Sequence, residues 1–197
     1  MQKYIPIAIC FAILLILLIV NTSSYKNTDH VNAYPNLPAP IGKEKILVTS
    51  AGQAIEGAIV QSIAESLNLQ ADYRPRALAS DLYDYHSVVV VLGYSANGLN
   101  YTHHTYEEEL NRIRGIAAEA KKTQLPLIAV HLSGNYRDDK KTFALFQQLA
   151  DSTDYFIALK SMNNISDYQR ELADFHTPVT LISDRESFKI PFNAAFR

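Results

Sequence analysis

The sequence predicts a three-layer α/β/α domain with a mostly parallel sheet of five to six strands, preceded by an N-terminal membrane helix. Two short runs, residues 46–48 and 88–91, are apolar without polar alternation, which is typical of strands that helices cover on both faces. Amphipathic helical patterns alternate with such runs, which is the order of successive βα units. Right-handed crossovers then favour a flavodoxin-like strand order, 2-1-3-4-5 with a sixth strand.

An unbroken apolar run near the N-terminus, YIPIAICFAILLILLIV, occupies residues 4–20. As a helix at ~1.5 Å per residue it would reach about 25 Å, close to the ~30 Å of a hydrocarbon core. Residues 1–22 are therefore expected to be a membrane anchor or a signal segment. Residues 21–24 contain no Ala-x-Ala cleavage site, which favours an uncleaved single-pass anchor over secretion after cleavage. With either alternative, we expect the domain to lie outside the cytoplasm.

A polar and then proline-rich segment, residues 23–42, follows the apolar run. Pro35, Pro38 and Pro40 disfavour a helix and an interior strand, so this segment is expected to be an extended tether. Residues 43–197 remain, and their length suits one α/β domain with a sizeable core.

The first predicted strand, residues 46–48, ends at a polar turn, residues 49–53. A helix is predicted next, because apolar residues recur every four positions: Ile55, Ile59, Ile63 and Leu67. Residues 71–76 are short and polar and suit an edge strand. Residues 87–92, SVVVVL, suit the centre of the sheet.

A second helix is predicted at residues 106–123, where acidic residues near its start and lysines near its end complement the helix dipole. Its first acidic residues, 107–109, are interpreted as a solvated helix start. Residues 96–105 before it are expected to form a long loop that could close as a lid. The remaining predicted elements are strands at 125–132, 155–159 and 178–182 and helices at 140–152 and 166–175. The tail, residues 184–197, has no assigned place.

Composition excludes several classes of function. Lys+Arg number 18 against 20 Asp+Glu, so no basic excess indicates a nucleic-acid partner. The only cysteine, Cys10, lies in the apolar segment, so the domain has no disulfide and no thiolate. Gly-x-Gly-x-x-Gly and Walker loops are absent, and we expect no cofactor. The histidines at 103, 104 and 131 lack metal-ligand spacing, so we expect no metal.

Polar stretches follow three of the predicted strands, so all three fall on the carboxyl edge of the sheet. The backbone N–H groups at a helix start carry partial positive charge, which favours an anion there. The sequence therefore predicts a site for a small polar or anionic ligand at this edge. The candidate ligand-binding residues are Ser50, Gly52, Gln53, Ser95, Asn97, His131 and Ser133.

The same three stretches read TSAGQ at 49–53, GYSANGL at 93–99 and HLSGNYR at 131–137. Together they resemble a family of small exported bacterial α/β proteins classed as a domain of unknown function. The resemblance spans about residues 45–184. Asn97 stands where the family has a basic residue, and Ser133-Gly134 stands where the family has Gly-Gly. The resemblance implies an exported α/β domain and no known reaction.

Three functions remain open from the sequence. The first is a membrane-tethered extracytoplasmic module that binds a small ligand or acts as an accessory protein. The second is a hydrolase that uses Ser50 or Ser95 with His131 at the carboxyl edge. The third is a structural interaction domain, whose protein partner the sequence does not identify.

Overall fold

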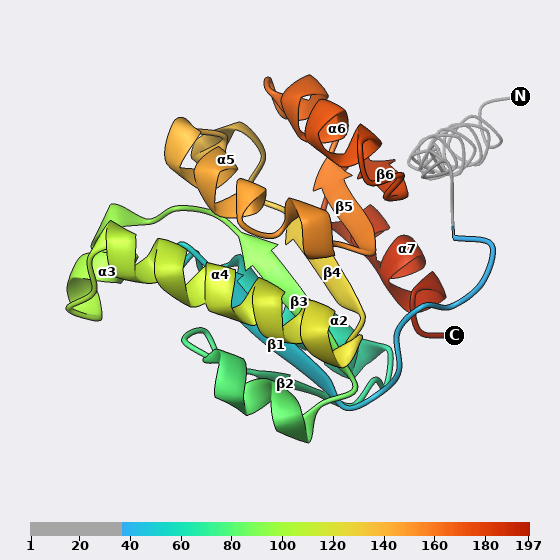
Figure 1. Ribbon diagram of the computed structural model, residues 1–197. Helices are drawn as coiled ribbons and strands as arrows, with labels where there is room; N and C mark the ends of the chain where they lie inside the picture. The colour runs from blue at the N-terminus through green and yellow to red at the C-terminus, as the bar shows by residue number, and fades with distance from the viewer. Residues whose placement is uncertain (1–36) are drawn as a thin grey trace, which may run out of the picture. The chain divides into compact units, whose positions relative to one another are not determined.

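Six parallel strands form the central sheet of residues 37–197, the part of the chain that the computed structural model describes (Figure 1). Their order is β2-β1-β3-β4-β5-β6, which confirms the flavodoxin-like order predicted from the sequence. The strands are β1 (Ile46–Ala51), β2 (Ala71–Tyr73), β3 (Ser87–Leu92), β4 (Leu127–His131), β5 (Tyr155–Leu159) and β6 (Val179–Ile182). The predicted membrane segment, 1–22, and the first part of the tether, 23–36, lie outside these residues.

Helices cover both faces of the sheet (Figure 1). The chain leaves β1 toward β2 in one direction and leaves β3 toward β4, β5 and β6 in the other. Right-handed crossovers therefore place α2 on one face and α4, α5 and α6 on the opposite face. The helices are α2 (Glu56–Ser66), α3 (Ala96–Tyr101), α4 (Tyr106–Thr123), α5 (Lys140–Gln147), α6 (Ile165–Ala173) and α7 (Lys189–Ala194). Shorter 3-10 turns are η2 (Ala79–Asp84), η3 (Gly134–Arg137), η4 (Ala150–Ser152) and η5 (Glu186–Phe188).

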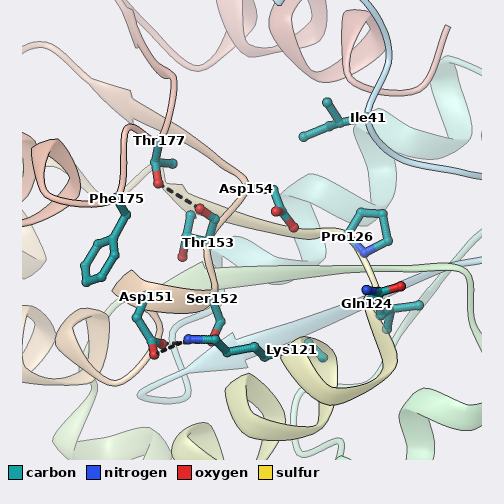
Figure 2. A pocket seen from close by; sticks show the side chains of 12 residues that line it. Ile41, Lys121, Gln124, Pro126, Asp151, Ser152, Thr153, Asp154, Phe175 and Thr177 are labelled. Atoms are coloured by element: carbon teal, nitrogen blue, oxygen red, sulfur yellow. Dashed lines mark hydrogen bonds and ion pairs between the residues drawn. The ribbon is translucent and has the colours of Figure 1, made fainter.

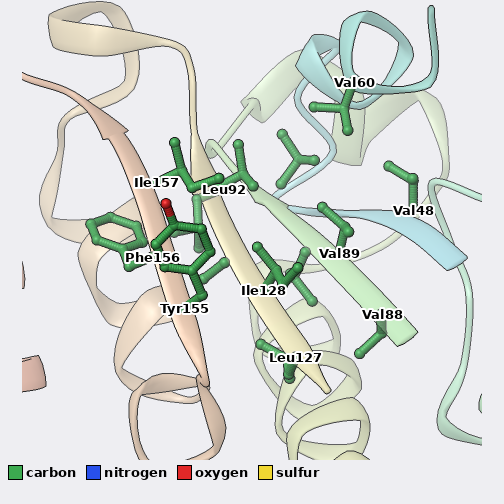
Figure 3. Packing of buried hydrophobic residues seen from close by; sticks show 14 of the residues in the cluster. Val48, Val60, Val88, Val89, Leu92, Leu127, Ile128, Tyr155, Phe156 and Ile157 are labelled. Atoms are coloured by element: carbon green, nitrogen blue, oxygen red, sulfur yellow. The ribbon is translucent and has the colours of Figure 1, made fainter. Parts of the chain in front are cut away.

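The core lies along β3 and its neighbours. Every residue of β1, β3, β4 and β5 is buried, because helices cover both faces of these strands. Figure 3 shows Val60 of α2 pointing toward Val48 and Val89 on one side of the sheet. The edge strand β2 has no fully buried residue, as its polar sequence predicts.

Two predicted segments differ in detail. Ile55 is 71% exposed because it precedes α2, whereas Glu56, Val60 and Ile63 are buried. Residues 96–101, expected to be part of a loop, form the helix α3. Ser95 caps this helix, since its side chain accepts a hydrogen bond from the N–H of Gly98 at 3.1 Å.

The tail folds back as η5 and α7. Phe188, Phe192 and Phe196 are buried at a spacing of four residues, which is the period of one helix face, while Ile190 is exposed. The end of the predicted tether packs here too, because Ile41 and Gly42 both donate backbone hydrogen bonds to the carbonyl of Ala195.

A membrane span is not found within residues 37–197, where no helix combines sufficient length with sufficient apolar character.

Replacing Val90 with Asp tests the central position of β3. Val90 is fully buried between Thr49 of β1 and Ala129 of β4, so the carboxylate would be buried without a partner. We expect a loss of several kcal/mol of unfolding free energy, measured by urea denaturation. Ile190→Asp, at an exposed position, is the matched control and should melt nearly as the wild type does. A soluble Val90→Asp variant with unchanged melting would contradict the assignment.

Candidate functional site

Glu109 of α4 occupies the end of β1 at the carboxyl edge. Its Oε1 atom accepts hydrogen bonds from the N–H of Gly52 at 2.7 Å and from Nε2 of Gln53 at 3.2 Å. The side chain is only 2% exposed, so the prediction of a solvated helix start is wrong for this residue. A carboxylate of the chain itself thus takes the N–H group that we expected to face a ligand.

Arg112 completes this arrangement. Its Nε and Nη2 atoms donate to the two carboxylate oxygens of Glu109 at 2.8 and 2.7 Å, which is a bidentate pair. The remaining N–H groups donate to the carbonyls of Ser50 and Ala77 and to the hydroxyl of Thr49. All five donors of this buried guanidinium therefore have acceptors.

The pKa of Glu109 reflects this pairing. Burial alone would raise it, but the hydrogen bonds and charge of Arg112 and the N–H of Gly52 outweigh burial, so the pKa is lowered from 4.5. Glu109 is consequently an anion at neutral pH, and the pair is a fixed internal ion pair.

The crevice between β1 and β3 is closed by backbone contacts. The N–H of Gly93 donates to the carbonyl of Ala51 at 2.9 Å, and the N–H of Ser95 donates to that of Gly52 at 2.8 Å. Gly52 has a φ of +94°, and a Cβ there would lie 2.7 Å from the carbonyl oxygen of Gly93. Only glycine fits this turn without a shift of the backbone.

The other predicted residues near β1 and β3 either form hydrogen bonds within the chain or are exposed. Ser50 donates its hydroxyl to the carbonyl of Ala54 at 3.0 Å and shares a hydrogen bond with the Tyr73 hydroxyl. Ser95 caps α3, and Asn97 is exposed on that helix. Neither serine is hydrogen-bonded to His131, so the described residues lack the nucleophile–base contact that the hydrolase alternative requires.

His131, the last residue of β4, is fully buried. Its ring lies 5.8 Å from the ring of Tyr168, and neither nitrogen makes a hydrogen bond of normal geometry within residues 37–197, although backbone groups of Arg137 and of His131 itself lie near the ring. Burial lowers the pKa of His131 below 6.5, and the charge of Asp138, the nearby backbone of Arg137 and the charge of Glu56 oppose this shift only in part. The imidazole is therefore neutral at pH 7.

Other buried polar atoms without partners gather around the carboxyl end of β4. Of the seven such atoms in residues 37–197, six lie here, so the unmet hydrogen-bonding capacity is concentrated at one place. They are Glu56 Oε2, His131 Nδ1 and Nε2, Ser133 Oγ, Asp138 Oδ1 and Tyr168 Oη. We call these five residues the β4 polar cluster.

Two arginines connect the β4 polar cluster to neighbouring loops. Arg137 of η3 approaches Glu56 at 3.6 Å, and Arg185, just before η5, approaches the same carboxylate at 3.9 Å. Their guanidinium groups also donate to the carbonyls of Tyr94 and Leu132, respectively. Glu56, Arg137 and Arg185 are not among the residues predicted from the sequence, although Arg137 ends the HLSGNYR stretch.

A pocket of about 530 Å³ lies beside the cluster, over the carboxyl ends of β4, β5 and β6. Ser133 and Arg185 line it, together with Tyr136, Leu159 and Ser161. Of the predicted residues, the structure thus brings His131 and Ser133 together near an open pocket. Gly52 and Gln53 instead donate hydrogen bonds to Glu109, and the carbonyl of Ser50 accepts one from Arg112.

A second pocket, of about 560 Å³, lies at the opposite edge (Figure 2). Pro126, Asp154 and Thr177 line it, and each lies shortly before a strand, so this is the amino edge of the sheet. Figure 2 also shows the ion pair between Lys121 and Asp151 at its rim. None of the predicted ligand-binding residues lines this pocket.

Metal ligands are not grouped within residues 37–197, where no set of three or more His, Cys, Asp or Glu side chains could hold an ion.

Removing one partner of the Glu109–Arg112 pair should be strongly destabilising. Arg112→Met leaves the Glu109 carboxylate buried without a cation, and we expect the free energy of unfolding to fall by about 3–5 kcal/mol in urea denaturation. The exposed Lys121–Asp151 pair is the matched control, and Asp151→Asn should change stability by less than about 1 kcal/mol. Equal effects of the two variants would contradict the structural role of Arg112.

The pH dependence of stability gives a separate prediction for Glu109. Because its folded pKa is below 4.5, its contribution is present above pH 4.5 and is lost as the pH falls through the folded pKa. The wild type should therefore lose more stability on acidification than Glu109→Gln does, as measured by thermal melting between pH 7 and pH 3. Parallel melting profiles would show that Glu109 is not the titrating group.

This chain is similar to a protein family and to parts of solved structures. A family model described as "Domain of unknown function (DUF6305)" matches residues 43–196, and no curated protein matches. The fold is similar to a hydroxyethylthiazole kinase protein from Pyrococcus horikoshii OT3, at 11% identity and a TM-score of 0.49 over 70% of this chain and 55% of that one. A dTDP-4-dehydrorhamnose reductase from Bacillus anthracis str. Ames, in complex with NADP, matches at 7% identity and a TM-score of 0.40. This match covers 59% of this chain and 53% of that one. The chain thus spans about half the length of these structures, and neither likeness bears on function.

Proposed function

The chain belongs to the family described as a domain of unknown function, DUF6305, and we propose that this member binds a small polar ligand at the carboxyl ends of β4, β5 and β6. The β4 polar cluster carries the proposal. Buried polar atoms normally have hydrogen-bond partners, and leaving one unpaired costs about 1–3 kcal/mol. Six such atoms gather around the end of β4, and one of them, Ser133 Oγ, belongs to a residue that lines the pocket, which favours a site that a polar molecule completes.

The position of the pocket supports the same proposal. Ligands of open α/β sheets bind outside the carboxyl ends of the strands. At the β1 end of this edge, the Glu109–Arg112 pair and the closed turns take up the polar groups. Near the end of β4, Ser133 lines the pocket, and its buried hydroxyl has no hydrogen-bond partner within residues 37–197. We therefore place the ligand there, next to Ser133 and Arg185.

Amide NMR shifts of the full-length chain in detergent micelles test this proposal. The probes are a panel of small polar compounds: glucose, glycine, acetate, acetamide and inorganic phosphate. We expect at least one to shift amides confined to residues 131–137, 159–161 and 183–186, with Ser133→Ala weakening its binding. A panel that shifts only residues around the amino-edge pocket of Figure 2, or none, would contradict the proposal.

A matched serine variant separates a local effect from a general one. Ser152 lines the amino-edge pocket, and its hydroxyl donates to Asp151 at 2.8 Å. Ser152→Ala should leave the affinity for the bound probe unchanged, whereas Ser133→Ala should reduce it. Equal losses in both variants would show that the loss at Ser133 is not specific to the site.

We also propose that the domain is tethered to a membrane outside the cytoplasm. The support is the apolar run at residues 4–20 and the absence of a good cleavage site after it. Full-length protein should sediment with membranes, resist carbonate extraction and keep its N-terminus, as checked by mass spectrometry. A soluble mature product that begins between residues 24 and 34 would contradict the anchor and indicate secretion.

A further inference from the structure

We propose that the group recognised in this site is a carboxylate, bound by Arg137 and Arg185 in competition with the chain's own Glu56. This inference rests on the proposed ligand-binding function and names its chemistry. It makes Glu56 an internal competitor that holds the two arginines when no ligand is bound.

The two guanidinium groups come from separate loops and approach one carboxylate. Nε of Arg137 lies 3.6 Å from Oε2 of Glu56, and Nη2 of Arg185 lies 3.9 Å from Oε1. Both distances are longer than a hydrogen bond, and Oε2 has no hydrogen-bond partner. Glu56 is thus held by charge alone between two groups that could bind a carboxylate more closely.

The hydrogen bonds of the arginines distinguish this pair from the structural arginine. Arg112 uses all five of its N–H donors within the chain. Among the described residues, Arg137 and Arg185 each donate only one hydrogen bond, to a backbone carbonyl. Their side chains are 25% and 47% exposed, so their remaining donors can meet a ligand from solvent.

Ser133 lies against the same group of side chains. A Cβ placed on Gly93 would lie 2.9 Å from Cδ of Arg137 and 3.1 Å from Oγ of Ser133, so these two side chains flank one glycine. The Ser133 hydroxyl has no partner and can donate to an oxyanion next to Arg137. The pocket wall thus offers one cation, Arg185, and the Ser133 side chain, and Arg137 lies close to that serine.

The surrounding charges favour a carboxylate over a phosphate. The space between the two guanidinium groups already accommodates one carboxylate, that of Glu56. Asp184 and Glu186 flank Arg185 in the pocket and add negative charge, which disfavours a dianion. Asp184 itself accepts hydrogen bonds from Ser183 and Ser187, so its carboxylate is bound within its own loop.

The test measures acetate binding through the arginine Nε–Hε NMR signals of the full-length chain. Acetate should shift the signals of Arg137 and Arg185 in the wild type. Glu56→Gln removes the competitor's charge and should tighten acetate binding about tenfold. Glu65→Gln removes the same charge from an exposed position nine residues further along α2, roughly 13 Å away, and it should change the affinity less than about twofold. Equal tightening in both variants would overturn the competition.

A second pair of variants keeps the test decisive if Glu56→Gln does not fold. Arg185→Met removes a partly exposed cation and should abolish acetate binding, whereas Lys160→Met, at an exposed position after β5, should leave it intact. Acetate that binds equally well to both variants, or that binds nowhere, would overturn the carboxylate assignment. Acetamide that shifts residues 131–137 as strongly as acetate does would also overturn it, while leaving the proposed function standing.

Discussion

The buried ion pair between Glu109 and Arg112 is the interaction on which the rest of the carboxyl edge depends. One residue of α4 binds the turn after β1, and its partner binds the carbonyls of Ser50 and Ala77. The pair therefore joins β1, the approach to η2 and α4 at one point. Two charges buried together are tolerated because every donor of the guanidinium has an acceptor. This requirement fixes the positions of three segments that are distant in the sequence.

The position of this pair limits where the proposed ligand could bind. Open α/β sheets commonly bind ligands where the strand order reverses, which is between β1 and β3 in this chain. There the N–H of Gly52 is occupied by Glu109, and backbone hydrogen bonds close the two turns. Within residues 37–197, six of the seven buried polar atoms without a hydrogen-bond partner lie instead around the end of β4. An internal carboxylate thus takes the usual place of an anion and leaves the neighbouring strands as the candidate site.

Much of the fold could be predicted from the sequence, because buried parallel strands leave continuous apolar runs. The order of the six strands and the bounds of α4 follow from such runs and from helix-end charges. The burial of Glu109 could not be predicted, because acidic residues in a first helical turn are usually solvated. Phe188, Phe192 and Phe196 of the tail carried a helical spacing that, taken alone, did not indicate a packing partner.

The candidate site could be predicted only in part. His131 and Ser133 were selected because they follow a strand, and the structure places both in the β4 polar cluster. Glu56 and Arg185 could not be selected in the same way. Glu56 lies on the buried face of α2, and that face differs from the one predicted from the sequence. Arg185 lies in the tail, which had no assigned place. Long-range ion pairs such as those of Glu56 depend on the folded arrangement and leave no local pattern.

A crystal structure of the chain, grown with a low concentration of acetate, tests the central claim most directly. The claim is that the carboxyl edge is closed at Gly52 and open to a ligand at Ser133 and Arg185. We predict ordered solvent or acetate density against Ser133 Oγ and the Arg185 guanidinium, with Glu109 bound to the N–H of Gly52. Density for an acetate ion on the N–H of Gly52, with Glu109 turned away, would contradict the account.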